Sequence, residues 1–251
     1  MRMRRKAEGR YQISATMKMA DLIDMNFDLV GVLARIGISF GFGEDTVEEV
    51  CARHGVNTNT FLLICIVYTF DNYVPTPGVL READLKDIVT YLRRSHDYYT
   101  QVAVTYLAES IEKMIGPCDS KYQNIIRSFF SQYKNELARH FEFEETQVFP
   151  YVMSVLEHRE DSGFTILQYE ENHTNVEEKL EDLKNILLKY LPPQCDSQNV
   201  MMVLSHLHLL EKDLQKHTLI EDDILVPVVN AMERDFTAKS GTTQKPGNDE
   251  E

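Results

Sequence analysis

Residues 140–150 read HFEFEETQVFP, and residues 217–227 read HTLIEDDILVP. Both segments follow the pattern H-x-x-x-E-[ED]-x-x-x-x-P, so the chain contains an internal repeat. A further histidine precedes each copy by the same interval, because His96 and His173 each stand 44 positions before the histidine that opens a copy. In a bundle of antiparallel helices, two residues separated by that interval can lie at a similar level on neighbouring helices.

The repeated residues have the chemistry of metal ligands. A His and a Glu four residues apart stand on the same helix face, so both can reach one inward site. Two copies and two upstream histidines supply four nitrogen donors and two anionic oxygen donors, a number that suits two metal ions. Carboxylates can bridge a metal pair, imidazole suits iron, copper, zinc and nickel, and the lack of Cys disfavours structural zinc and iron–sulfur ligation. We therefore predict a di-iron centre, with manganese or zinc as alternatives, bound by His96, His140, Glu144, His173, His217 and Glu221.

The apolar pattern around these residues predicts an all-α fold. Apolar side chains recur at three- and four-residue spacing in four long segments, near residues 84–115, 120–157, 163–190 and 197–234. Gly and Pro residues separate most of them. Four long amphipathic helices with short connections imply an antiparallel four-helix bundle, and the core of such a bundle is a usual place for a metal site. We assign residues 76–236 to the bundle.

The remainder of the chain is predicted to form a small helical domain and a tail. Residues 14–70 read as short helices over 17–27, 28–36, 45–54 and 59–70, with Thr16 and either Asn57 or Asn59 as N-caps. Two prolines and a glycine within residues 71–80 mark a linker. We place an N-terminal domain in residues 1–75 and a disordered polar tail in 237–251.

Charge and composition narrow the classes of function. The net charge of -14 argues against a nucleic-acid partner, since phosphate binding needs a clustered basic surface. No apolar stretch is long enough for a bilayer and the start lacks a secretory signal, so we expect a cytoplasmic protein without a membrane partner. The four cysteines form no C-x-x-C pair, and we expect ordinary free thiols at Cys51, Cys65, Cys118 and Cys195.

Other residues fall beside the expected ligands. Three tyrosines lie on or near the ligand faces, where a phenol could pack in the core or hydrogen-bond a ligand: Tyr99, Tyr133 and Tyr169. Glu145 and Asp222 directly follow the two glutamates of the repeat. Each of these carboxylates could orient a ligand imidazole or face solvent.

With these residues in view, the chain resembles the hemerythrin-like superfamily, and within it the iron–sulfur cluster repair di-iron proteins, over nearly its whole length. In that family a hemerythrin-like bundle with the ligand order H, H-x-x-x-E, H, H-x-x-x-E follows a small helical N-terminal domain. The resemblance implies two iron ions with oxo and carboxylate bridges, held by the four histidines, with Glu144 and Glu221 as the bridging carboxylates.

The resemblance extends to the N-terminal part, with one departure. Residues 32–40, VLARIGISF, and 46–51, TVEEVC, are similar to the family segment "LerfGIdfCCgG…sLeeaC". Gly41-Phe42 replaces the family's adjacent Cys pair, so the resemblance does not carry the thiol chemistry of that pair to this chain. Oxygen-carrying hemerythrin has a further histidine where Glu177 stands, four residues after His173. This difference favours the repair-type site, with a coordination position open to oxygen, nitric oxide or peroxide.

The function that the resemblance implies is repair of iron–sulfur or mononuclear iron centres damaged by nitric oxide or oxidants. Its partners would be client iron proteins, and the N-terminal domain would contact a client or a second subunit in a homodimer. Three alternatives stay open. These are a sensor or carrier of oxygen or nitric oxide, a redox enzyme that turns over with a reductant, and a metal-free bundle whose buried carboxylates are compensated by protonated histidines.

Overall fold

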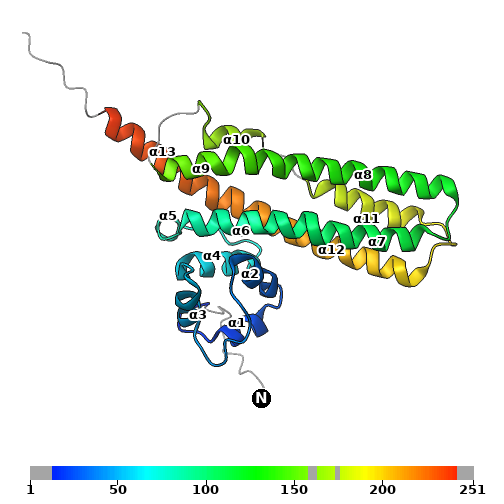
Figure 1. Cartoon of the computed structure of the whole chain (residues 1–251), viewed down its shortest axis with the longest axis horizontal. Coiled ribbons are helices and arrows are strands. Elements are labelled where there is room, and N and C mark those ends of the chain that lie inside the picture. The colour runs from blue at the N-terminus through cyan, green and yellow to red at the C-terminus, as the bar shows by residue number, and fades with distance from the viewer. Residues whose placement is uncertain (1–12, 158–162, 173–175, 242–251) are drawn as a thin grey trace, which may run out of the picture. The chain divides into compact units, whose positions relative to one another are not determined.

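The structure is a computed structural model, and it describes residues 13–157, 163–172 and 176–241. Within these ranges the regular structure is helical, and one isolated bridge joins Lys18 to Thr46. The predicted all-α fold is confirmed (Figure 1). The chain divides into two compact units, Met1–Asp87 and Ile88–Glu251, and the domain limits expected from the sequence stay a prediction.

The N-terminal unit consists of short helices whose ends follow local sequence signals. Asn57 caps a helix as expected, because its side chain accepts a hydrogen bond from the backbone N–H of Thr60. Gly37 and Gly55 end two helices in the left-handed conformation, with φ of 92° and 68°, which glycine adopts without steric cost. The helices are α1 (Met19–Met25), α2 (Leu29–Ile36), α3 (Val47–His54), α4 (Thr58–Thr69) and α5 (Pro77–Leu80).

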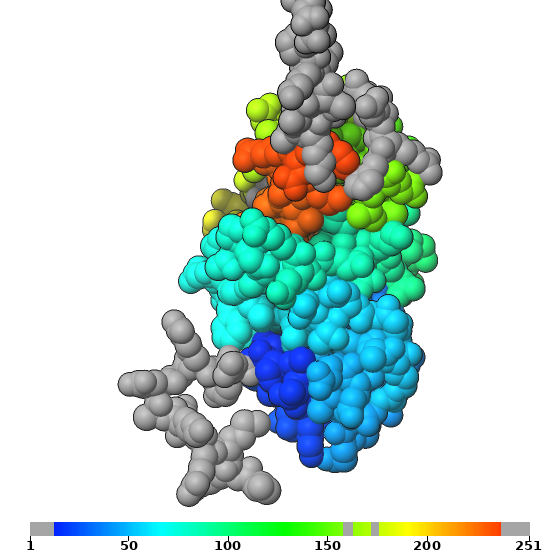
Figure 2. Space-filling view, turned by 90° about the vertical axis from the view of Figure 1, so that its left-hand side faces the viewer, coloured from blue at the N-terminus to red at the C-terminus, as the bar shows by residue number. Residues whose placement is uncertain are grey.

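Two details of this unit differ from expectation. Thr16 is not an N-cap, because α1 begins at Met19 and the preceding Lys18 makes no side-chain cap hydrogen bond. The expected linker contains α5, which starts at Pro77, a position where the missing N–H breaks no helical hydrogen bond. The face of the unit seen in Figure 2, in blue and cyan, is closed, without a deep hollow.

Four long helical segments make up the second unit, and the first of them begins at Leu85, three residues before the unit does. The first comprises α6 (Leu85–Asp97), the π-helix η1 (Tyr98–Ala103) and α7 (Val104–Ile115). The second comprises α8 (Ser120–Phe143), the π-helix η2 (Glu144–Val148) and α9 (Phe149–Leu156). The third comprises α10 (Ile166–Asn172) and α11 (Glu178–Tyr190). The fourth comprises α12 (Ser197–Ile220), the π-helix η3 (Glu221–Leu225) and α13 (Val226–Gly241).

These segments pack as the sequence predicted. Helix α7 contacts α8 and α12, and α11 contacts the same two helices, which closes a four-helix arrangement (Figure 1). Its core is built from buried apolar side chains that include Leu107, Ile111, Phe130, Leu183 and Leu207.

Helix α13 reaches Gly241, five residues into the stretch expected to be disordered, and the rest of that stretch lies outside the described residues. Among the residues described, no helix is both long and apolar enough to span a membrane.

The internal repeat appears as repeated local structure. Helices α8 and α12 both have 24 residues, and each begins after an aspartate, Asp119 or Asp196, whose side chain accepts a hydrogen bond from a backbone N–H three residues on. Each helix then passes into a five-residue π-helix that is followed by a proline, Pro150 or Pro227. A proline lacks the N–H donor and crowds the carbonyl four residues before it, so a locally wider turn accommodates it.

The cysteines give the main correction to the sequence analysis. Cys118 and Cys195 form a disulfide, with their Cα atoms 5.5 Å apart, so the expectation of four free thiols is wrong for this pair. The bridge spans 77 positions, the same offset that separates the two copies of the repeat, and therefore joins two equivalent interhelical connections. Cys51 and Cys65 are free and buried, and burial raises the pKa of the Cys51 thiol to about 11.

Candidate metal centre

Four of the six predicted ligands meet inside the second unit. His96, Glu144, His217 and Glu221 each offer one ligand atom, and these atoms all lie within 4.8 Å of one another. All four residues are buried. They come from three helical segments that are far apart in sequence, so the bundle fold itself assembles the group.

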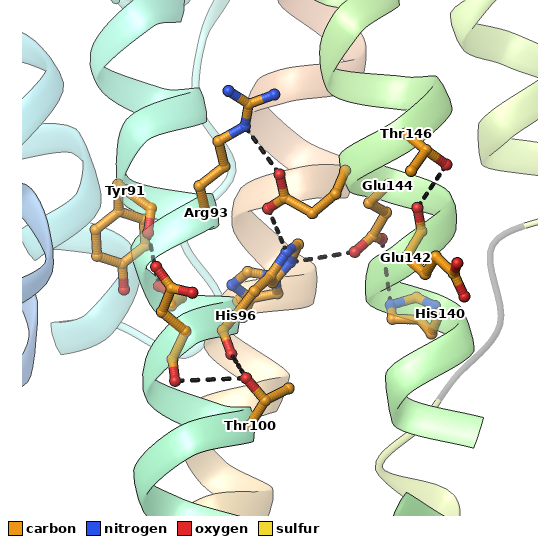
Figure 3. A network of polar contacts seen from close by, with 12 residues as sticks. Tyr91, Arg93, His96, Thr100, His140, Glu142, Glu144 and Thr146 are labelled. Carbon is orange, nitrogen blue, oxygen red and sulfur yellow. Dashed lines mark hydrogen bonds and ion pairs between the residues drawn. The ribbon is translucent and has the colours of Figure 1, made fainter. Parts of the chain in front are cut away.

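The contacts between these residues are short and continuous. His96 Nε2 lies 3.2 Å from Glu144 Oε2 and 3.1 Å from His217 Nε2. His217 Nε2 lies 3.2 Å from Glu221 Oε1, and His140 Nε2 lies 3.2 Å from Glu144 Oε1. Glu144 therefore spans two imidazoles, with one oxygen toward each (Figure 3).

The π-helices coincide with these residues. Glu144 is the first residue of η2, Glu221 is the first residue of η3, and η1 begins two residues after His96. Single π-turns inside α-helices widen the helix locally and often occur at functional sites. Among the described residues, each π-helix thus begins at or just after a predicted ligand.

A carboxylate outside the group orients His96. Glu145 Oε1 lies 3.0 Å from His96 Nδ1, and Arg93 Nε donates to the other oxygen, Glu145 Oε2, at 3.0 Å (Figure 3). The contact places the proton of a neutral His96 on Nδ1 and turns Nε2 toward Glu144 and His217. Glu145 thus takes the orienting position suggested by its sequence. Sequence reasoning missed Arg93, for which the available signal was its position one helical turn before His96.

Aromatic rings enclose the imidazoles. The ring of His96 stacks on Phe141, with centroids 4.0 Å apart, and on Phe149 at 5.5 Å. The rings of Tyr99 and His217 meet edge to face, with centroids 5.5 Å apart. These rings separate the polar group from solvent, which strengthens its electrostatic interactions.

The three tyrosines named from the sequence have different surroundings. Tyr99 donates its hydroxyl to the backbone carbonyl of Asp213, away from the carboxylates. Tyr133 is buried in the core, and its hydroxyl has no hydrogen-bond partner among the described residues. Tyr169 donates its hydroxyl to Glu144 Oε1 at 2.7 Å. Among the described residues, the hydrogen bond from Tyr169 thus joins a phenol to a predicted ligand.

The carboxylates of the group favour a positive charge on the neighbouring imidazole. Burial alone would lower the pKa of His96, but its hydrogen bonds to Glu144 and Glu145 and the charge of Glu221 outweigh burial and raise this pKa to about 9. Burial alone would likewise raise the pKa of Glu144, but the neighbouring histidines hold it below its usual range. The charged forms of His96 and Glu144 therefore stabilise each other.

The donor set fits a metal. When His96 is neutral, its Nε2 lone pair faces a carboxylate oxygen and a second imidazole nitrogen. Lone pairs that converge in a buried site repel one another unless a proton or a metal ion lies among them. Imidazole nitrogen with carboxylate oxygen is a ligand set suited to transition metals.

One predicted ligand cannot be placed. His173 lies outside the described residues. Glu177, four positions later, is buried, and its Oε1 accepts a hydrogen bond from the Thr218 hydroxyl at 2.8 Å.

A buried group of histidines and glutamates in the core of a helical bundle defines the class of protein as a metal-binding bundle. The model of the hemerythrin HHE cation-binding domain matches residues 87–232, and the chain belongs to this family. A curated relative is the iron–sulfur cluster repair protein ScdA of Staphylococcus haemolyticus (strain JCSC1435), which is 24% identical over 200 residues and aligns with 77% of this chain and 89% of its own length. The resemblance to the hemerythrin-like iron–sulfur cluster repair family is thereby confirmed.

Proposed function

We propose that this chain is a non-haem di-iron protein that takes part in the repair of iron–sulfur or iron centres damaged by nitrosative or oxidative stress. The convergence of His96, Glu144, His217 and Glu221 in one buried group is the observation that supports it best. The proposed ligand set adds His140 and, from the sequence repeat, His173. Glu144 and Glu221 would be the bridging carboxylates.

The contacts of Glu144 support two metal ions rather than one. Its two oxygens face different imidazoles, His96 and His140, as those of a carboxylate shared between two ions would. Glu221 stands at the equivalent position of the second repeat and lies against His217. Mixed nitrogen and carboxylate ligands from four helices are typical of di-iron bundles, although many of these use a shorter Glu-x-x-His spacing. Bound iron would supply one-electron chemistry and a position for a diatomic ligand such as oxygen or nitric oxide.

The chain's own residues would hold that centre in a defined geometry. Glu145 and Arg93 keep the Nε2 atom of His96 aimed inward. Phe141 and Phe149 cover the same imidazole and exclude water. The buried carboxylates balance the positive charge of the metals.

The repair role itself rests on similarity. The relative from Staphylococcus haemolyticus carries iron–sulfur cluster repair in its name, and the alignment covers most of both chains. We propose client iron proteins as partners, a cytoplasmic location, and contact of the N-terminal unit with a client or with a second copy of the chain.

The test begins with protein purified without a metal-affinity tag and loaded with Fe(II) under anaerobic conditions. We expect about two irons per chain, and a large loss of iron in a His140→Ala/His217→Ala variant. His208→Ala, which removes an exposed histidine of α12, is the matched control and should retain the metal. Less than about a tenth of an iron per wild-type chain would contradict the proposal.

Repair is then measured on a client. A dehydratase whose [4Fe–4S] cluster has been damaged with nitric oxide is incubated with the iron-loaded protein, a thiol and no free iron. We expect recovery of dehydratase activity with wild type and with His208→Ala, but not with the double variant. Equal recovery with all three proteins would contradict the repair role without contradicting the metal site.

A further inference from the structure

Tyr169 lies close to the metal centre without belonging to the repeated ligand set. It is in α10 (Ile166–Asn172), is 2% exposed, and donates its hydroxyl to Glu144 Oε1 at 2.7 Å. The two copies of the repeat are offset by 77 positions, so the residue equivalent to Tyr169 in the first half is Leu92. A leucine side chain cannot donate a hydrogen bond. The phenol is therefore a feature of one half of the bundle.

A contact with a residue outside the predicted ligand set holds the helix that carries Tyr169. The backbone N–H of Ile166, at the start of α10, donates to Glu233 Oε1 at 2.9 Å, and the same oxygen accepts a hydrogen bond from the Tyr151 hydroxyl. Helix α10 packs along α13, on which Glu233 lies. The start of α10 is thus held by Glu233 of α13, a residue that is not among the predicted ligands.

The phenol donates its hydroxyl hydrogen to an oxygen of a carboxylate, a group that accepts through both of its oxygens. A protonated phenol beside a carboxylate donates its proton into a charge-assisted hydrogen bond, which is short and strong. The distance of 2.7 Å agrees with such a bond.

The oxygen that accepts this bond also faces a predicted ligand. Glu144 Oε1 lies 3.2 Å from His140 Nε2, while Oε2 faces His96. A donor fixed on Oε1 restricts the rotation of the carboxylate. It also draws electron density from that oxygen, which makes Oε1 a weaker donor to a metal than Oε2.

We infer that Tyr169 is a positioning residue of the metal centre, which holds the Glu144 carboxylate between His96 and His140 and weakens one of its oxygens as a metal ligand. This inference rests on the proposed function, because it assigns a role toward the proposed di-iron centre. The role assigned to Tyr169 makes the two halves of the repeated site different, because the equivalent residue of the first half, Leu92, cannot donate a hydrogen bond.

The test compares Tyr169→Phe with Tyr133→Phe. Both substitutions remove a hydroxyl from a buried tyrosine of the second unit, but Tyr133 makes no hydrogen bond to the predicted ligands among the described residues. The readouts are the Fe(II) affinity, from anaerobic competition with a chromophoric chelator, and the midpoint potential of the iron-loaded protein. For Tyr169→Phe we expect Fe(II) affinity to fall on the order of 10-fold, because the lost positioning of Glu144 outweighs the stronger donation from its freed oxygen. We also expect its midpoint potential to fall, because a carboxylate that is a stronger donor stabilises Fe(III). Tyr133→Phe should match wild type in both.

The outcomes separate this inference from the proposed function. Wild-type protein that binds no Fe(II) would overturn the proposed function. Wild-type protein that binds Fe(II), together with a Tyr169→Phe variant equal to Tyr133→Phe in affinity and potential, would overturn the inference alone. Loss of helical circular dichroism in Tyr169→Phe but not in Tyr133→Phe would also overturn it, by making the role of the phenol structural.

Discussion

At the scale of single residues, the contact between Glu145 and His96 decides how the first imidazole faces the site. Replacing Glu145 with Ala removes the acceptor at His96 Nδ1 and leaves Arg93 without this ion pair. We expect Fe(II) affinity to fall on the order of 10- to 100-fold, as is typical when the partner of a metal-bound histidine is lost. Chelator competition measures the change. Glu142→Ala, which removes an exposed carboxylate three positions earlier, is the control, and an equal loss in both variants would contradict an orienting role.

The raised pKa of His96 gives a prediction for the metal-free protein. The folded-state pKa of about 9 lies above the ordinary value of 6.5, so the protonated imidazole stabilises the fold fully below about pH 6.5. This stabilisation is lost as the pH rises through about 9, and it is on the order of 3 kcal/mol. Urea unfolding of the metal-free protein between pH 6 and pH 10 measures it, and we expect the free energy of unfolding to decrease over that range.

Two comparisons check the source of this pH dependence. A His96→Gln variant should lose most of it, because the titrating group is gone. Iron-loaded protein should also lose it, since a metal-bound histidine is neutral. A metal-free wild type whose stability stays flat from pH 6 to pH 10 would show that His96 is not protonated in the folded state.

At the scale of structural elements, the disulfide joins the connection between α7 and α8 to the connection between α11 and α12. Helix α8 has 24 residues between Cys118 and the first residue of η2, so the bridge lies about 36 Å along the helix from Glu144. Closing a loop of 77 residues stabilises a fold by on the order of 4 kcal/mol in the chain-entropy model.

We therefore predict that a Cys118→Ser/Cys195→Ser variant is less stable but retains iron binding. Thermal and urea unfolding should show the loss of stability, and chelator competition should show unchanged Fe(II) affinity. Cys51→Ser, at a buried free thiol, controls for the cost of a buried hydroxyl. Unchanged stability of the double variant, together with two more reactive thiols in denatured wild type than in the denatured double variant, would mean that the bridge does not form in solution.

The helices themselves were predictable to different degrees. The segments of the bundle lie close to their expected limits, because apolar spacing and the prolines and glycines between them are local signals. The π-helices were not predicted, although Pro150 and Pro227 mark two of them, because the repeat was interpreted as regular helix. The disulfide could not be predicted from spacing, since Cys118 and Cys195 approach each other through the bundle fold.

At the scale of the whole molecule, the chain combines a helical N-terminal unit with a bundle built from two copies of one pattern. The repeat in the sequence predicted the ligand set, because each predicted ligand recurs at the same place in each half. Arg93 escaped this reasoning because it does not recur in the second half. The spacing of Tyr169 placed it near a ligand face, but its contact with Glu144, like that of Arg93 with Glu145, depends on packing between segments distant in sequence.

The most direct test of the central claim is anomalous X-ray diffraction at the iron edge from crystals of the protein loaded with Fe(II). We predict two anomalous peaks per chain, one on each side of the Glu144 carboxylate, with Glu221 contacting both and His173 completing the ligand set. An iron-loaded crystal with no peak among His96, Glu144, His217 and Glu221 would contradict the account. A single peak at that position would confirm a metal site and refute the di-iron centre.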